Sequence, residues 1–140
     1  MSWRVVIRNN VWQKVQDRVD AATTDLRHAY PVRPASFPEL PAAYVGDIRM
    51  QMVADAGTKR TRAEADIHIV HSVIDNEESK DTLDAIVDAL EDDFTADPHV
   101  IFSNTVSEPT SITDTAETVG SLVYTSVILT IGNILIVEGR

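Results

Sequence analysis

The segment from Ala65 to Phe94 restricts the possible folds more than any other part of the sequence. Apolar and polar residues alternate from Ala65 to Val73, which is typical of a strand with one buried face. The next residues, 77–94, place large apolar side chains on one side of a helix, namely Leu83, Ile86, Val87, Leu90 and Phe94. A strand and a helix that are each apolar on one face, and adjacent in sequence, are expected to pack against each other.

Before this segment, the sequence predicts a helix, a linker and the first strand of a hairpin. Apolar residues at helical spacing predict a helix over residues 10–29, and the short apolar run at 3–7 is compatible with a strand or an early helical turn. Four prolines within residues 30–42 predict an extended linker. Alternation over 43–53 then predicts a strand with an apolar face of Tyr44, Ile48, Met50 and Met52.

Residues 54–62 have the composition of a loop, with a glycine near the middle. The segment 43–73 is therefore expected to be an antiparallel hairpin with a long, mobile tip.

Residues 99–137 predict further strands with a flexible loop between them. The apolar residues of 100–106 indicate one strand, and the polar segment 107–120 indicates a loop that is mobile in the free protein. Residues 122–131 are apolar on both faces, which predicts a central strand. Gly132 and Asn133 can form a two-residue turn or simply break that strand. The final apolar run, 134–137, is then either a returning hairpin strand or a patch for a partner.

The expected elements fit one domain over residues 1–140. Its fold class is α+β, with two main helices packed on a mixed, mostly antiparallel sheet of about four to five strands.

The chain is acidic, with 12 Lys and Arg against 22 Asp and Glu and a formal net charge of −10. Such a charge disfavours binding to bulk DNA or to acidic membranes unless a local basic patch exists. Lys59, Arg60 and Arg62 form one basic group within the predicted loop. A run of charges is usually only a solvated surface, and the alternative is a docking site for an acidic surface, a phosphate or a protein.

The sequence predicts no catalytic group, no metal site and no cofactor. The chain has no cysteine and lacks the GxSxG, P-loop and GxGxxG motifs. His68 and His71 would face opposite sides of a strand and could not share a metal ion, and Asp66 with His68 would supply only two ligands. The N-terminal residues contain no long apolar run, so no signal peptide or membrane span is predicted and a cytoplasmic site of synthesis is expected.

The order of the expected elements resembles that of the tail terminator proteins of long-tailed bacteriophages, also called tail completion or minor tail proteins. The resemblance rests on the opening helix at 10–29, the segment 40–47 that leads into the first strand, and the strand and helix at 64–73 and 77–94. It also includes the closing strand at 122–131, so that it covers most of the chain.

This resemblance implies a structural role in the virion and no enzymatic activity. Tail terminators form a ring, typically a hexamer, on the head-proximal end of the tail tube, where they stop tube growth and offer a joining surface to the head–tail connector. Genomic DNA passes through the ring without sequence-specific binding, no membrane is involved, and assembly takes place in the host cytoplasm. The candidate contact residues are Lys59, Arg60, Arg62, Ile134, Leu135, Ile136 and Val137.

Two alternatives to a tail terminator remain open at this point. The first is a head–tail connector or stopper protein of the same virion, which would share the size and the ring-forming habit. The second is a cellular binding module or small enzyme, which would be monomeric or dimeric and have a concave pocket.

Overall fold

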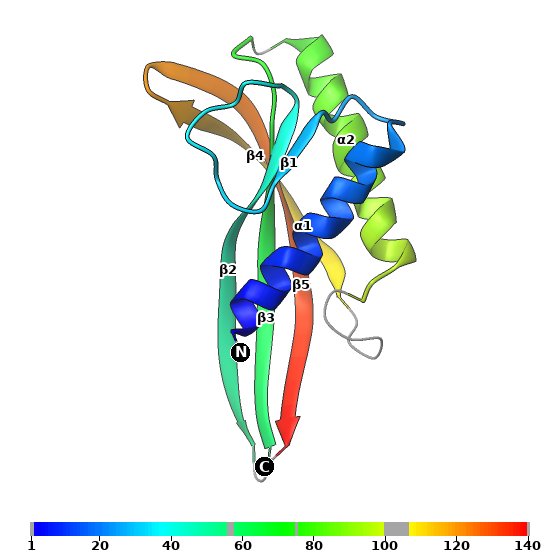
Figure 1. Ribbon diagram of the computed structural model, residues 1–140, viewed down its shortest axis with the longest axis vertical. Coiled ribbons are helices and arrows are strands. Elements are labelled where there is room, and N and C mark those ends of the chain that lie inside the picture. Colours follow the sequence, from blue (N-terminus) through cyan, green and yellow to red (C-terminus); the bar gives the residue numbers. More distant parts are fainter. Residues whose placement is uncertain (1, 56–57, 75, 100–106, 140) are drawn as a thin grey trace.

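The computed structural model describes residues 2–55, 58–74, 76–99 and 107–139. In this part of the chain two helices and five strands form an α+β fold, as the sequence predicts (Figure 1). The elements are α1 (Trp3–Ala21), β1 (His28–Tyr30), β2 (Ala42–Asp55), β3 (Thr58–Val70), α2 (Glu77–Ala96), β4 (Glu108–Val119) and β5 (Leu122–Gly139). The strand order is β1-β2-β3-β5-β4, in which β1 and β2 are parallel and the other pairs are antiparallel.

The helix α2 confirms the apolar stripe that the sequence predicts. Its buried large side chains are Leu83, Ile86, Val87, Leu90 and Phe94. The helix begins after Asn76, whose side-chain oxygen accepts a hydrogen bond from the backbone N–H of Ser79 at 2.9 Å. Glu77 and Glu78 lie in the first turn, where negative charge is favourable.

The helix α1 begins and ends earlier than the predicted 10–29, so the predicted bounds were wrong. Residues 3–7 form its first turns, and its buried residues are Ile7, Val11 and Val15. The helix ends at Ala21 and is capped by Ala22, which adopts a left-handed conformation with φ 55°. Leu26 is buried although it lies beyond the helix. Apolar residues at helical spacing therefore continued past the true end of the helix.

Both helices pack on the same face of the sheet. Their buried side chains belong to one cluster with alternate residues of the strands, among them Ala43, Ala65, Ile67 and Leu129. The indole N–H of Trp12 also donates a hydrogen bond to the backbone carbonyl of Ala29, at 3.1 Å, and so ties α1 to β1. The strand and helix of 65–94 are thus parts of the same core.

The opposite face of the sheet is covered at one end by the proline-rich segment 31–41, which follows β1. Phe37 from this segment stacks on Tyr44 of β2 and meets the ring of Tyr124 edge-on. The predicted linker therefore contributes a second, smaller apolar cluster. In Figure 1 the segment lies beside β1, near the turn that joins β4 and β5.

A β-bulge in β2 makes the predicted faces of this strand wrong. Val45 pairs with Ile67 and Ile48 pairs with Ala65, so that β2 has one more residue than β3 between these pairs. The extra residue places Tyr44 on the opposite face from Ile48, whereas strict alternation predicted that the two share a face. The bulge occurs at Gly46 and Asp47, and Gly46 leaves room for the His68 ring.

Two predicted loops are strands in the structure. Lys59, Arg60 and Arg62 lie within β3, because β2 and β3 pair as far as Asp55 and Thr58. The predicted flexible loop 107–120 is mostly β4, which pairs with β5 along its whole length. The predicted strand at 100–106 lies outside the described residues.

The final apolar run neither turns back nor leaves the sheet. β5 continues through Gly132 and Asn133 to Gly139, and pairs with β3 on both sides of this point. A second register shift occurs here, since Ala63 pairs with Ile134 and Ala65 pairs with Ile131. Asn133 has a positive φ of 58°, which is consistent with a bulge and not with the predicted turn or break.

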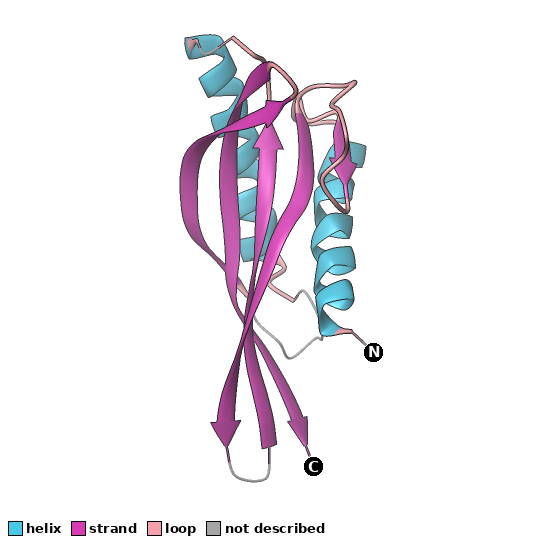
Figure 2. Cartoon of the chain, turned by 90° about the vertical axis from the view of Figure 1, so that its left-hand side faces the viewer, coloured by secondary structure: helices cyan, strands magenta, loops and turns pink. Residues whose placement is uncertain are grey.

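Beyond this bulge the sheet narrows to three strands, which we call the arm. It consists of residues 50–55, 58–63 and 134–139. β4 ends its pairing with β5 at Gly132, so that among the described residues the arm contains these three strands alone. Figures 1 and 2 show these three strands extending beyond the ends of both helices. We call the remainder of the structure the body.

Candidate interaction surface

The structure brings the two predicted groups of contact residues together in the arm. The basic group lies on β3 and the apolar run lies on the neighbouring part of β5. Arg60 pairs with Val137, and Arg62 pairs with Leu135. These groups are more than 70 residues apart in sequence, and only the antiparallel β3–β5 pairing makes them neighbours.

Arg60, Arg62, Leu135 and Val137 share one face, which we call the arm face. Directly paired residues of an antiparallel sheet point to the same side. Both arginines are exposed, and Leu135 and Val137 keep 41% and 53% of their surface exposed. The arm face therefore combines guanidinium groups with accessible aliphatic side chains, a combination suited to contact with another protein.

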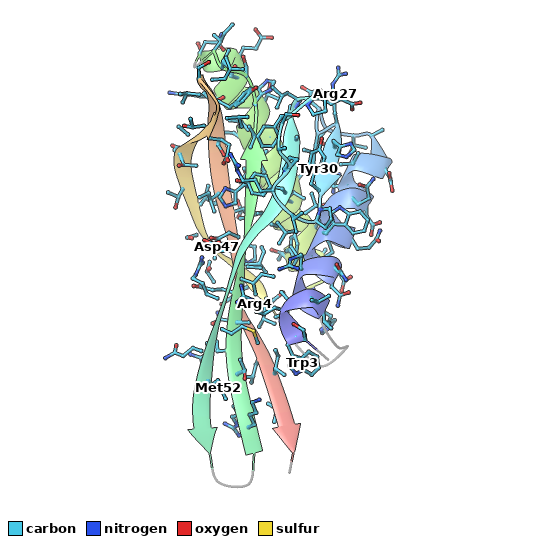
Figure 3. The ribbon with its side chains drawn as sticks, turned by 60° about the vertical axis from the view of Figure 1, so that its left-hand side comes forward. Trp3, Arg4, Arg27, Tyr30, Asp47 and Met52 are labelled. Carbon is cyan, nitrogen blue, oxygen red and sulfur yellow. The ribbon has the colours of Figure 1, made fainter. Side chains whose placement is uncertain are left out.

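Ile134 and Ile136 point to the other side of the arm and are fully buried. They join the main core cluster together with Ala63, and Trp3 at the start of α1 packs against the same cluster. Figure 3 shows Trp3 beside the point where the arm leaves the body. Of the four predicted contact residues in the apolar run, Ile134 and Ile136 therefore stabilise the fold, and only Leu135 and Val137 are accessible to a partner.

An ion-pair network anchors the base of the arm to the body. Arg49 contacts Asp66 through two hydrogen bonds of 2.7 and 2.9 Å, and contacts Glu64 at 2.7 Å. The hydroxyl of Thr130 on β5 also donates a hydrogen bond to Asp66, at 2.9 Å. Burial acts to raise the pKa of Asp66, but the hydrogen bonds from Arg49 and Thr130 outweigh it, so the pKa lies below its ordinary value. The network links β2, β3 and β5 where the fourth strand ends.

The exposed side of α2 is strongly acidic. Five exposed carboxylates follow one side of the helix at spacings of three or four residues: Glu77, Asp81, Asp84, Asp88 and Asp92. We call this row the acidic row. Asp93 lies beside it and forms a two-point ion pair with Arg18 of α1. Carboxylates thus line the exposed side of α2 over most of its length, whereas Glu91 and Asp93 are only partly exposed.

A group of polar side chains that the sequence did not reveal connects the strands at the other end of the sheet. We call this group the clamp; it consists of Arg33, Tyr44, His68 and Glu117. Glu117 on β4 accepts hydrogen bonds from Arg33 at 2.5 Å and from the Tyr44 hydroxyl at 2.7 Å. His68 stacks on Tyr44, with its Nδ1 3.8 Å from the Glu117 carboxylate. These residues come from four separate segments, and no spacing in the sequence relates them.

The clamp is built for packing more than for proton transfer. Burial lowers the pKa of His68, although Glu117 and Asp66 act in the opposite direction. Burial and the hydrogen bond to Glu117 raise the pKa of Tyr44. A distance of 3.8 Å is too long for a hydrogen bond between His68 and Glu117. The clamp thus fixes segment 31–41 and β4 to the centre of the sheet.

A groove of about 640 Å³ lies between the end of α1, the end of segment 31–41 and the start of α2. Its charged side chains have both signs and include Asp25, Arg27, Glu39 and Glu78. His71 also lines it, and burial lowers the pKa of that histidine. The groove is the concave feature that a binding module would use.

In residues 2–55, 58–74, 76–99 and 107–139, no three His, Asp or Glu side chains are arranged to hold a metal ion. Within the same ranges, neither helix is apolar enough over a sufficient length to cross a membrane.

Comparisons of the sequence with protein families and with curated proteins find no match.

Proposed function

We propose that this protein is a structural virion protein that caps the head-proximal end of a phage tail tube. As a ring, it would stop tube polymerisation and form the joining surface for the head–tail connector. In this role the protein performs no chemistry and needs no cofactor. Its partners are further copies of itself, the tail tube protein and the connector, while genomic DNA passes through the ring.

The observation that carries the proposal is the arm. It extends a sheet beyond the helices that cover the body, and it displays two arginines and two aliphatic side chains on one face. A monomer gains little stability from the exposed arm face, whereas a subunit of an assembly can use it to contact a neighbour. The order of elements that resembles the tail terminators gives this assembly its proposed identity.

The acidic charge supports the same role. A formal charge of −10 on each subunit would make the lining of a ring negative on average. DNA would then pass along the ring without adhering to it.

The test is the length of tails made in infected cells that lack this protein. Overlong tubes without heads, returned to normal length by the wild-type chain, are the expected result. Normal tails beside filled, unattached heads would instead place the protein in the connector or stopper class. Normal infectious particles would contradict both assignments.

The groove beside α1 and α2 favours a second candidate, a cellular binding module. The two candidates differ in the mass of the protein in solution. A ring-forming subunit is expected to assemble as concentration rises, whereas a binding module with this groove would remain monomeric or dimeric.

A further inference from the structure

The arm and α2 carry opposite charge. The three strand segments of the arm contain three basic and two acidic residues, whereas α2 contains eight acidic residues and one basic residue. Because the whole chain has a net charge of −10, the arm is locally positive on an acidic protein. An electrostatic partner for the arm is therefore present on every copy of this chain.

The two surfaces also match in spacing and in side-chain chemistry. Arg60 and Arg62, two residues apart on a strand, lie about 7 Å apart, and successive carboxylates of the acidic row, three or four residues apart on a helix, lie about 5–6 Å apart. Arginine guanidinium groups bind carboxylates through paired hydrogen bonds. Ala85 is exposed beside the acidic row and leaves space there for Leu135 or Val137.

An arm cannot meet the acidic row of its own chain. The arm extends away from the body, beyond the ends of both helices (Figures 1 and 2). The two surfaces are different parts of the chain, so a contact between copies would be head-to-tail, the type of interface that produces closed rings or filaments.

We propose that the arm face of one copy docks on the acidic row of α2 in a second copy. Arg60 and Arg62 pair with carboxylates of the row, and Leu135 and Val137 pack beside them against the helix. The inference deepens the proposed function, because it supplies the contact that a tail-capping ring requires. It concerns self-association, which is measured without phage tails.

Two charge-reversed variants test the contact as a pair. The variant Arg60→Glu/Arg62→Glu has an acidic arm and an acidic α2, whereas Asp84→Lys/Asp88→Lys has a basic arm and two lysines at the centre of the acidic row. All four substituted residues are exposed, so both variants are expected to fold, which circular dichroism checks. Native mass spectrometry and light scattering at low ionic strength then report the assembled fraction.

The wild-type chain is expected to assemble and each variant alone to remain monomeric. An equimolar mixture of the two variants should assemble again, with equal numbers of each chain, because each arm then meets a row of opposite charge. A control, Arg27→Glu, reverses an exposed arginine at the end of the body opposite the arm (Figure 3) and should assemble like the wild type. Added salt should dissociate the wild-type assembly, since exposed ion pairs are screened.

A monomeric wild-type chain, assembly of either variant alone, or a mixture that stays monomeric would overturn the arm–α2 contact. A monomeric wild-type chain would also favour the binding module over the ring-forming subunit. The other two results would leave tail capping untouched, because the tail-length experiment measures it independently. Conversely, a restored mixture would support the contact even if tails made without the protein were normal.

Discussion

The body and the arm are parts of one continuous sheet, but they differ in how their side chains are covered. In the body, helices cover one face and segment 31–41 covers part of the other, so that Ile67, Ile69 and Leu129 are fully buried. In the arm, β2, β3 and β5 continue without β4, and Leu135 and Val137 remain accessible. The same strands thus pass from a folding core to an exposed extension.

The difference teaches that the two sides of the arm differ: Ile134 and Ile136 belong to the core, whereas the arm face is a poor source of folding energy. Burial of apolar surface drives folding, at roughly 25 cal/mol per Å², and the arm face buries little of it. The Arg49–Asp66 network marks the boundary, because it joins three strands just before the sheet narrows. The predictions below test this division, from the largest expected effect to the smallest.

The largest effect is expected in the body, at α2. Leu90→Ala should lower the free energy of unfolding by about 2–5 kcal/mol, because the lost side chain leaves a cavity beneath the sheet. Asp88→Ala on the exposed side of the same helix should cost about 0.5 kcal/mol or less. Urea denaturation of both variants measures the difference, and equal losses would show that the body core is wrongly assigned.

A smaller effect is expected at the bulge in β2. A Cβ atom at Gly46 would lie 2.5 Å from Cδ2 and Nε2 of His68, so Gly46→Ala must displace the buried ring. The expected loss is about 1–3 kcal/mol. In the His68→Ala background the same substitution should cost much less, because the ring is absent. Equal costs in the two backgrounds would disprove the packing role of Gly46.

The pH dependence of stability should report the two partly buried histidines, His68 and His71. Burial holds the folded-state pKa of His68 and of His71 below the ordinary value of 6.5. The unfolded chain therefore binds more protons as the pH falls through about 6.5, and the free energy of unfolding should decrease there. His68→Phe should reduce this decrease, and adding His71→Gln should reduce it further. An unchanged pH profile in the double variant would contradict the assignment.

The smallest effect on folding is expected at the arm face. Leu135→Ala and Val137→Ala should each change the free energy of unfolding by about 0.5 kcal/mol or less. Ile134→Ala, in the same strand but fully buried, should cost about 2–5 kcal/mol. A loss at Leu135 as large as the loss at Ile134 would remove the distinction between the two sides of the arm.

The sequence predicted the parts of the fold whose apolar pattern is regular. The stripe of α2 and the buried alternation at Ala65, Ile67 and Ile69 were identified correctly, because one face of each element is covered in the structure. The pattern failed at Gly46, where one extra residue reverses the faces of β2.

The polar strands were missed for a related reason. β4 is an edge strand with mostly exposed side chains, so its sequence has no apolar alternation to distinguish it from a loop. Its four threonines are the one local signal, since β-branched residues favour strands. The basic group at 59–62 looked like a loop for the same reason. The composition of the candidate surface was predicted, but its geometry depends on the long-range β3–β5 pairing.

Hydrogen exchange on the free and the assembled protein tests the division between body and arm most directly. In the free protein, the backbone amides of 58–63 should exchange faster than those of 65–70 in the same strand. The arm has less buried surface, so its backbone hydrogen bonds should open more often. On assembly, the arm amides and those of the exposed side of α2 should become protected while the core of the body stays unchanged. An arm that is as protected as the body in the free protein, and unaffected by assembly, would contradict the account.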